Sequence, residues 1–448
     1  MKSASSAQAK NLASKTSGII NRPPEDLKPW PGNPRTHSDK QLVKLKASIQ
    51  KFGFTAPVLV DEEGVILSGH GRVLAAKALD LATIPTRIIP GLTEAKKRAY
   101  VIADNKLAQL SAWDDAALKA EMEILIRDEF DIETTGFSTA EVDIMFDDPA
   151  APVSDDPDDL QSEDIPEEIT SRKGDLWLLG NHRLLCGDAL DVACYQTVIQ
   201  DEQAQMTITD PPYNVRINGH VCGGGKVKHK EFAMASGEMS PSEFTTFLSS
   251  AFSHLHARSQ DGAIHFMFMD WRHMREIQDA AKPLFGAPRQ LCVWVKDNGG
   301  MGTFYRSQHE LVFVFKKGTA PHINNFELGQ HGRYRTNVWN YPGVNTLKGK
   351  GHQLLALHPT VKPVSLIADA IRDCSHHKGI ILDPFAGSGT ILIAAERTDR
   401  YARAIELDPK YVDVAVMRWQ RVTGKQAVLA ATGQTWDEVR DERLPAED

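Results

Sequence analysis

Apolar and polar positions follow two periods along this chain, one typical of helices and one typical of strands. Leu42, Leu45 and Ile49 recur at helical spacing within residues 39–52, and the pattern stops at Gly53, which predicts a helix. The pattern then predicts a β-hairpin followed by a second helix, over residues 56–60, 65–67 and 73–79. Residues 1–21 lack such a pattern and are predicted to be a disordered tail.

From residue 171 onward a longer pattern predicts an α/β domain. A hairpin over residues 175–186 comes first. Helices are expected after the Ser240 capping box and over residues 192–199, 272–285, 363–374 and 391–397. Strands are expected over residues 206–209, 263–269, 290–295, 310–315, 379–382 and 402–407. Strands that alternate with helices indicate a mostly parallel sheet covered on both faces.

The net charge of −8 is concentrated in one segment of the 448 residues. Residues 1–110 hold 17 Lys+Arg and 9 Asp+Glu, residues 111–170 hold 2 and 20, and the remainder holds 32 and 30. The segment charges are therefore +8, −18 and +2, and the two flanking regions remain able to approach a polyanion. Residues 147–170, rich in Asp and Pro, are predicted to be an acidic linker. Mimicry of nucleic acid by this segment is the alternative.

Several classes of protein are excluded by the composition. The five cysteines show neither CxxC pairs nor zinc spacing, and we expect no metal site and a reducing cytoplasm. The first residues contain no apolar signal region, and no run of 18 apolar residues predicts a membrane span. With 42% hydrophobic residues, the chain is long enough for two or three domains.

One candidate site follows the predicted strand over residues 206–209. Asp210, Pro211, Pro212 and Tyr213 come directly after it. Two prolines stop the strand and stiffen the turn, because each has a fixed φ and no N–H. A carboxylate, a free carbonyl and an aromatic ring in one volume suit a planar amine, which needs two acceptors and a stacking surface. A proline-rich loop without function is the alternative.

A second candidate site lies at the ends of two later strands. The run Asp383–Thr390 contains Gly387 and Gly389 and leads into a helix, so the backbone can approach a ligand closely. Glu406 ends the next strand, where a carboxylate can bind both hydroxyls of a ribose. This arrangement indicates a cofactor that contains adenosine.

Together these stretches resemble the β-class amino-group DNA methyltransferases over about residues 172–425. Cys186-Gly187-Asp188 and His358-Pro-Thr-Val-Lys-Pro363 are similar to two further motifs of that class. The resemblance implies a Rossmann-like, mostly parallel seven-stranded domain over residues 171–448 and S-adenosylmethionine as cofactor. It implies transfer of a methyl group to N6 of a flipped adenine in double-stranded DNA, with catalysis by residues 210–213. The implied cofactor-binding residues are Asp188, His358, Lys362, Asp383, Phe385, Gly387, Gly389, Thr390 and Glu406.

Two irregular stretches are expected to contact DNA. Residues 214–237 combine three glycines with basic side chains and suggest a closing loop, with a disordered insertion as the alternative. Residues 318–356 mix basic and aromatic side chains, which suits phosphate contact and base stacking. The candidate DNA-binding residues are Arg216, Lys226, Lys228, Arg333 and Arg335.

The run Ser68-Gly69-His70-Gly71-Arg72 follows a predicted strand and precedes a helix, and its backbone N–H groups offer an anion cradle. A tight turn with an exposed arginine is the alternative. Residues 22–110 resemble the ParB/sulfiredoxin-like N-terminal domain, although His70-Gly71-Arg72 replaces the usual Glu-Arg-Arg. The resemblance implies a nucleotide or phosphate at Gly69, His70, Gly71 and Arg72. With a helical extension, this α+β domain is predicted to cover residues 22–146.

The alternatives to an adenine methyltransferase are an N4-cytosine methyltransferase and a ParB-like DNA-binding protein without activity. Aspartate at position 210 favours adenine, whereas serine there would favour cytosine. We expect a monomer or homodimer in the cytoplasm of a bacterium or in a phage, associated with the nucleoid and related to restriction-modification systems.

Overall fold

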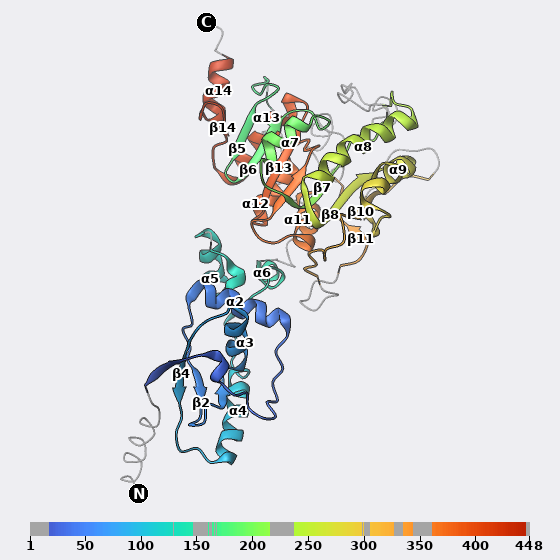
Figure 1. The fold of residues 1–448 in the computed structure, drawn as a ribbon. Helices are drawn as coiled ribbons and strands as arrows, with labels where there is room; N and C mark the ends of the chain where they lie inside the picture. The colour runs from blue at the N-terminus through green and yellow to red at the C-terminus, as the bar shows by residue number, and fades with distance from the viewer. Residues whose placement is uncertain are drawn as a thin grey trace. The chain divides into compact units, whose positions relative to one another are not determined.

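The computed structural model describes residues 18–128, 130–146, 160, 164, 166, 168–215, 237–297, 299, 305–326, 335–343 and 361–444. Contacts within the chain divide it into two units, Met1–Phe146 and Asp147–Asp448 (Figure 1). Each unit has its own buried apolar clusters. No helix in the described ranges combines the length and the hydrophobicity that crossing a membrane requires.

The N-terminal unit combines a small sheet with helices. The strand order in the sheet is β1-β4-β2-β3, in which β2 and β4 run parallel and the other neighbouring pairs run antiparallel. The elements are β1 (Ile19–Arg22), η1 (Pro24–Asp26), α2 (Asp39–Phe52), β2 (Val58–Val60), β3 (Ile66–Ser68), α3 (His70–Ala78), β4 (Ile84–Ile88), α4 (Glu94–Ala108), α5 (Asp115–Arg127), η2 (Ile132–Thr135) and α6 (Thr139–Phe146).

The predicted helix over residues 39–52 is confirmed as α2, and its ends follow from local sequence. The Ser38 side chain accepts a hydrogen bond from the backbone N–H of Gln41, which satisfies a donor that the helix start leaves unpaired. Gly53, at a φ of 76°, ends the helix. The predicted hairpin is also confirmed, because β2 and β3 pair antiparallel.

Helix α3 begins three residues before its predicted start. Gly69 is its N-cap at a φ of 100°, so His70, Gly71 and Arg72 form the first turn instead of a loop ahead of the helix. A Cβ atom on Gly71 would lie 3.0 Å from the ring of His37. Because a side chain at this position would crowd His37, the first turn of the helix contains a glycine despite the low helix propensity of that residue.

The C-terminal unit is an α/β domain. Its elements are β5 (Leu176–Leu179), β6 (His182–Cys186), α7 (Val192–Ile199), β7 (Ala204–Thr209), α8 (Pro241–Ala257), β8 (Ser259–Met269), η4 (Trp271–His273), α9 (Met274–Phe285), β9 (Gln290–Val295), β10 (His309–Lys316), β11 (Val338–Asn340), α11 (Val364–Cys374), β12 (Ile380–Asp383), α12 (Thr390–Arg397), β13 (Tyr401–Glu406), α13 (Pro409–Thr423), β14 (Val428–Leu429) and α14 (Trp436–Arg443).

The strands described in this unit form one sheet, in the order β11-β9-β10-β8-β7-β12-β13-β6-β5-β14. The central run from β8 through β7, β12 and β13 to β6 is parallel throughout. The described sheet has ten strands instead of the seven that the resemblance implies. The short strands β11 and β14 and the hairpin strand β5 extend its edges, and the Rossmann-like α/β class itself is confirmed.

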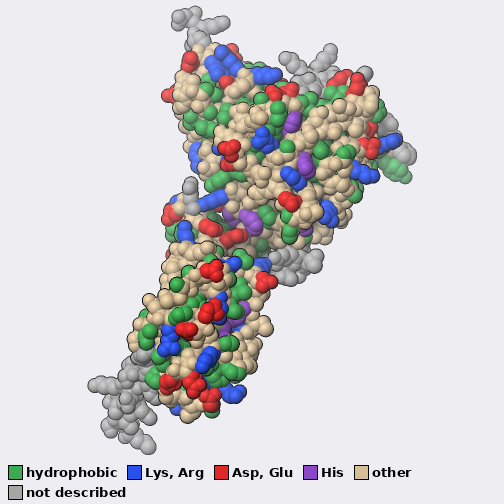
Figure 2. Space-filling model, in the orientation of Figure 1, with side chains coloured by type: hydrophobic (Ala, Val, Ile, Leu, Met, Phe, Trp, Pro, Cys, Tyr) green, Lys and Arg blue, Asp and Glu red, His purple; other side chains and the backbone are tan. Residues whose placement is uncertain are grey.

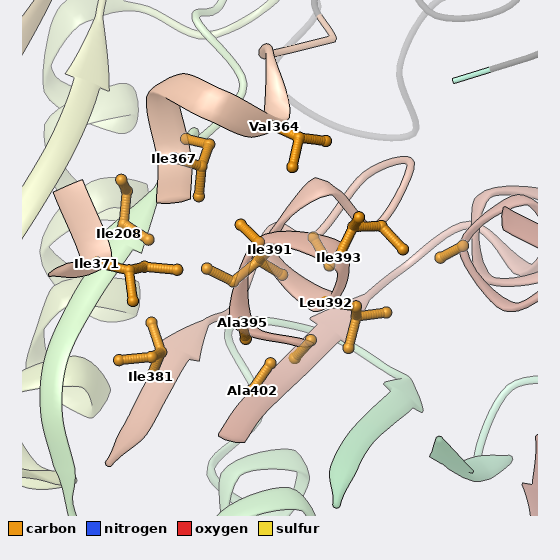
Figure 3. Packing of buried hydrophobic residues seen from close by; sticks show 14 of the residues in the cluster. Ile208, Val364, Ile367, Ile371, Ile381, Ile391, Leu392, Ile393, Ala395 and Ala402 are labelled. Carbon is orange, nitrogen blue, oxygen red and sulfur yellow. The ribbon is translucent and has the colours of Figure 1, made fainter. Parts of the chain in front are cut away.

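Successive strand residues point to opposite faces of the sheet, and each face has its own helices. Ile381 in β12 packs in a cluster with α11, α12 and α13, whereas its neighbour Leu382 packs in a cluster with α7, α8 and α9. Figure 3 shows the first face, where Ile371 and Ile391 from the helices meet Ile208 and Ile381 from the strands. This double covering fixes the central strands whose ends carry the candidate site.

The end of the predicted acidic linker belongs to the packing of the C-terminal unit. Leu160 is 4% exposed and packs in a cluster with Val361. Asp164 is 1% exposed and accepts hydrogen bonds of 2.7 and 3.0 Å from the guanidinium of Arg421 in α13. The expectation of a solvated linker over residues 147–170 is therefore wrong for these two residues, because an apolar contact and an ion pair bind them to the fold.

Charged side chains of both signs are interspersed on the face that Figure 2 shows. On the described part of this face, Lys and Arg lie among Asp and Glu and do not form a patch of one sign. The near-neutral balance of residues 171–448, 32 Lys+Arg against 30 Asp+Glu, agrees with this mixture. Charge on this face therefore does not identify a surface for DNA.

Candidate active site

The two candidate stretches meet at the carboxyl ends of neighbouring parallel strands. Strands β7 and β12 pair in parallel, with Met206 opposite Ile381. Their ends therefore lie side by side, and the hydroxyl of Thr209 donates a 2.8 Å hydrogen bond to the carboxylate of Asp383. Segments that are 174 residues apart in the chain thus share one edge of the sheet.

Five side chains form a largely buried network around the turn that follows β7. The hydroxyl of Tyr213 donates to Oδ1 of Asp210 at 2.6 Å and lies 3.0 Å from Oε2 of Glu310. The ammonium of Lys362 lies 2.5 Å from Oδ2 of Asp210 and 3.1 Å from Oε2 of Glu310. Lys296 donates to the second oxygen of Glu310 at 2.5 Å. We call these five residues the Asp210–Glu310 network.

Aromatic rings surround the ammonium of Lys362, whose side chain is 5% exposed. Its Nζ lies 5.0 Å from the ring centroid of Phe268, 5.7 Å from that of Tyr213 and 5.8 Å from that of Trp294. The faces of these rings attract a cation. Two carboxylates and three rings therefore fix the position of this lysine beside Asp210.

The charges in the network influence one another strongly. Burial raises the pKa of Asp210, Lys362 opposes this rise and Glu310 adds to it. Burial also disfavours the charged form of Glu310, but Lys362 and Lys296 outweigh it and lower the pKa of Glu310 to about 2. The pKa of Tyr213 lies well above its usual value because of burial and the two carboxylates, so its hydroxyl remains a donor.

The loop between β12 and α12 has the backbone form that the glycines predict. Gly387 has a φ of 53° and Gly389 a φ of 76°, both in the left-handed region. A Cβ atom on Gly389 would lie 2.5 Å from Cβ of Ala415 in α13, so glycine is required where the loop crosses that helix. The backbone N–H of Gly387 donates a 2.8 Å hydrogen bond to the carboxylate of Glu406 at the end of β13.

Two more carboxylates lie at the same edge of the sheet. Strands β6 and β13 pair in parallel, and the backbone N–H of Gly187 donates to the carbonyl of Glu406, which places Asp188 directly beyond the end of β6. Burial raises the pKa of Glu406 and that of Asp383 to about 7, although hydrogen bonds to both groups oppose the rise. Asp188, Asp383 and Glu406 therefore come from three adjacent strands.

Three family models match consecutive parts of this chain. A DNA methylase model matches residues 204–417, which contain the turn after β7, the glycine loop and Glu406. A ParB N-terminal domain model matches residues 7–105. The chain belongs to the N6/N4 DNA methylases and carries a ParB N-terminal domain. A model for the ParB-methyltransferase HTH domain matches residues 116–173, which contain the whole of the predicted linker over residues 147–170.

Among the individual relatives, one is a ParB-like domain protein and others are DNA methyltransferases. The ParB-like nuclease domain-containing protein YnaK of Escherichia coli K12 is 46% identical over 80 residues, which are 18% of this chain and 92% of YnaK. The type II methyltransferase M.ScaI of Streptomyces caespitosus is 37% identical over 87 residues, 19% of this chain and 29% of M.ScaI. A solved structure, the M1.HpyAVI complex with SAM, is 18% identical with a TM-score of 0.36 and covers 53% of this chain and 98% of that one.

S-adenosylmethionine is the cofactor of these DNA methylases, and the residues at this edge fit it. The Glu406 carboxylate accepts N–H bonds from Gly387 and Asp408, and no Lys or Arg among the described residues pairs with it. Its remaining lone pairs can accept the two hydroxyls of a ribose. The left-handed glycines leave the backbone of the loop open to close approach.

Binding of S-adenosylmethionine to this DNA methylase should strengthen as pH rises through about 7. A ribose hydroxyl donates best to an ionised carboxylate, and Glu406 has a pKa near 7. The ionised fraction of Glu406, and with it the affinity, therefore increases from pH 6 to pH 8. Calorimetric titration of the cofactor at several pH values measures the trend. Glu406→Gln should weaken binding and flatten the trend, and an unchanged trend in this variant would contradict the assignment.

The predicted cofactor set is brought together only in part. Phe385 is half-buried and packs 6.0 Å from the ring of Phe247, and Thr390 is buried with its hydroxyl 3.4 Å from the backbone carbonyl of Lys362. The side chain of Lys362 contacts Asp210 and Glu310, so the structure places it at the turn after β7 and not in the glycine loop. His358 lies outside the described residues.

The predicted DNA-binding residues are mostly outside the described ranges, which leave out Arg216, Lys226, Lys228 and Arg333. The guanidinium of Arg335 lies 3.0 Å from Asp373 and 3.3 Å from Asp369, both in α11. It also donates to the hydroxyl of Tyr341. Since these partners occupy Arg335 within the fold, its geometry favours a structural role over a contact with DNA phosphate. A contact of Arg335 with DNA stays a prediction that these contacts do not favour.

In the ParB domain, the predicted anion cradle is the first turn of α3. The backbone N–H of Trp30 donates to Nε2 of His70 at 3.2 Å, and Arg72 donates to the carbonyl of Pro57 at 3.3 Å. The Nε atom of Arg72 is buried and has no hydrogen-bond partner among the described residues. Burial lowers the pKa of Arg72 and, together with His37, that of His70. The alternative of an exposed arginine is therefore not what the structure shows, because Arg72 is partly buried.

Sequence reasoning missed Glu310 and Lys296. Glu310 is the only charged position between His309 and Lys316, within the otherwise apolar strand β10. A lone carboxylate in an apolar strand is the signal that would have found it, because such a charge is buried only with partners. Those partners come from other strands and loops, so the sequence alone did not name them.

Proposed function

We propose that this DNA methylase transfers a methyl group to N6 of an adenine at a specific site in double-stranded DNA. The observation that carries the proposal is the Asp210 carboxylate, held by Tyr213 and Lys362 beside the glycine loop. Aspartate at the first position of this turn favours adenine over cytosine. The ring of Tyr213 is available to stack on a base.

The chemistry follows from the groups at the turn. The exocyclic amine of adenine is a poor nucleophile because its lone pair is delocalised into the ring. The carboxylate of Asp210 and the carbonyl of Pro211 can accept its two N–H bonds, which turns the lone pair toward the methyl donor. S-adenosylmethionine, when bound, supplies a methyl group activated by a sulfonium. As the new N–C bond forms, the bond from the methyl carbon to sulfur would break and leave a neutral thioether, while Asp210 stabilises the positive charge on the amine and accepts the proton that it loses.

An adenine in a duplex cannot reach the Asp210–Glu310 network, because only about a fifth of the Asp210 side chain is exposed. The base must therefore leave the stack and enter the site, as for other enzymes that act on bases. Alignment of the amine with the methyl donor then supplies much of the catalysis.

Analysis of the methylated base tests the proposal. DNA incubated with the protein and tritiated S-adenosylmethionine should, after digestion to nucleosides, contain N6-methyldeoxyadenosine as the labelled product. Label in N4-methyldeoxycytidine would support the alternative specificity. Absence of label would support the second alternative, a DNA-binding protein without activity. Long-read sequencing of the product DNA would give the recognised site.

A second proposal concerns the ParB domain, where we infer that the first turn of α3 binds a phosphate group of a nucleotide. The unpaired Nε of Arg72 supports it, because a buried donor without a partner is costly and an anion would satisfy it. Calorimetry with nucleoside triphosphates should detect binding that Arg72→Gln abolishes. Equal binding by the variant, or no binding by the wild type, would refute it.

A further inference from the structure

Glu310 contacts three members of the network, Tyr213, Lys362 and Lys296. It lies on β10, which is separated from β7 by β8. One of its oxygens lies 3.0 Å from the Tyr213 hydroxyl and 3.1 Å from Nζ of Lys362, and the other accepts from Lys296 at 2.5 Å. Its side chain is 12% exposed.

Burial of the Glu310 carboxylate costs desolvation free energy. Residues 311–315, which follow Glu310 in β10, are all apolar and buried. A buried ion pair often contributes less stability than apolar residues of the same volume would. Stability alone therefore does not explain a carboxylate at the start of this strand, and its contacts point toward Asp210.

We propose that Glu310 is a positioning residue for methyl transfer: it shares the Lys362 ammonium and the Tyr213 hydroxyl with Asp210, and so leaves Asp210 able to accept the amine. The inference rests on the proposed function, in which Asp210 binds the amine of a base. Without Glu310, Lys362 and Tyr213 would bond to Asp210 alone and compete with the substrate for its lone pairs.

Removing the charge of Glu310 and removing the charge of Lys296 should shift the basicity of Asp210 in opposite directions. The groups that face Asp210 are Lys362, Tyr213 and Glu310, and Asp383 also interacts with it from β12. Loss of the negative charge of Glu310 moves Lys362 fully to Asp210 and makes Asp210 a weaker base. Loss of Lys296 leaves Glu310 without its outer partner and draws Lys362 toward Glu310, which makes Asp210 a stronger base.

The experiment measures single-turnover methyl transfer against pH for the full chain and three variants. Glu310→Gln should lower the rate about tenfold to a hundredfold. It should also move the acidic limb of the pH–rate profile, where the rate falls as Asp210 is protonated, to lower pH. Lys296→Gln should move the acidic limb to higher pH. Glu310→Asp keeps the charge, so its limb should stay near that of the wild type although its rate falls. The KM for S-adenosylmethionine should change less than the rate.

A matched control and a folding measurement complete the design. Glu202 pairs with Arg403 just before β7 begins, at the opposite end of that strand from Asp210. Glu202→Gln should leave the pH profile unchanged, and circular dichroism reports whether each variant is folded. If Glu310→Gln does not fold, the shift in Lys296→Gln and the unshifted limb of Glu310→Asp decide the question.

The possible failures are distinguishable. A wild type that forms no N6-methyladenine would refute the proposed function. If the wild type is active but Glu310→Gln and Lys296→Gln show no shift of the acidic limb, or shifts of the same sign, the positioning role of Glu310 is refuted.

Discussion

Asp210→Asn should reduce single-turnover methyl transfer about a thousandfold while the protein still binds S-adenosylmethionine. An amide keeps the shape of the side chain, but it has one acceptor oxygen instead of two and cannot take the proton from the amine. Glu310 remains to compensate the charge of Lys362, at 3.1 Å, so the fold should tolerate the change. Tritium incorporation into DNA measures the rate, and calorimetry measures cofactor affinity.

A matched control for this variant is Asp399→Asn. Asp399 pairs with His377 and lies just before β13, at the opposite end of that strand from Glu406. This variant should methylate DNA at the rate of the wild type. Turnover by Asp210→Asn within tenfold of the wild type would defeat the assignment of Asp210 as the acceptor of the amine.

Gly389→Ala should destabilise the C-terminal unit and abolish cofactor binding. Its Cβ atom would lie 2.5 Å from that of Ala415, and the residue has a φ of 76°, which L-residues disfavour. Steric overlap and backbone strain together should cost about 2–4 kcal/mol of unfolding free energy. Relief of the overlap must move the glycine loop away from α13. Urea denaturation and calorimetry with S-adenosylmethionine measure the two effects.

Gly424 separates the effect of strain from that of overlap. It has a φ of 68° at the end of α13, and a Cβ atom there would meet nothing within 4 Å. Gly424→Ala should therefore show the strain alone, about 1 kcal/mol, with normal cofactor affinity. If Gly389→Ala proves no worse than Gly424→Ala, close packing of the loop on α13 is not what requires the glycine.

Helices and strands whose apolar residues recur at a regular spacing were predictable from sequence. Residues 39–52, 192–199 and 290–295 form the expected helices and strand at the expected bounds. Capping residues and apolar periodicity lie within each of these segments, so no distant contact was needed to define them. The start of α3 was missed because Gly69, and not the later end of the polar run, is the N-cap.

The candidate site was predictable only where its residues stand in a motif. The turn at Asp210 and the loop at Gly387 are local patterns, and parallel pairing of two strands brings them together. The contacts of Lys362 and Glu310 depend on which strands are neighbours in the sheet, and sequence spacing contains no such information. Leu160 was assigned to a linker for the same reason, because its partner Val361 lies some two hundred positions away.

The hydrogen bond from Thr209 to Asp383 joins two strands that the polypeptide visits far apart. Both stretches keep their places through the register of β7 with β12, and neither depends on the length of chain between them. The order in which the two stretches occur in the chain is therefore not essential to the site. A circularly permuted C-terminal unit in which the glycine loop precedes the Asp210 turn would bring the same side chains together. New termini could be opened in a connection remote from this edge without dismantling it.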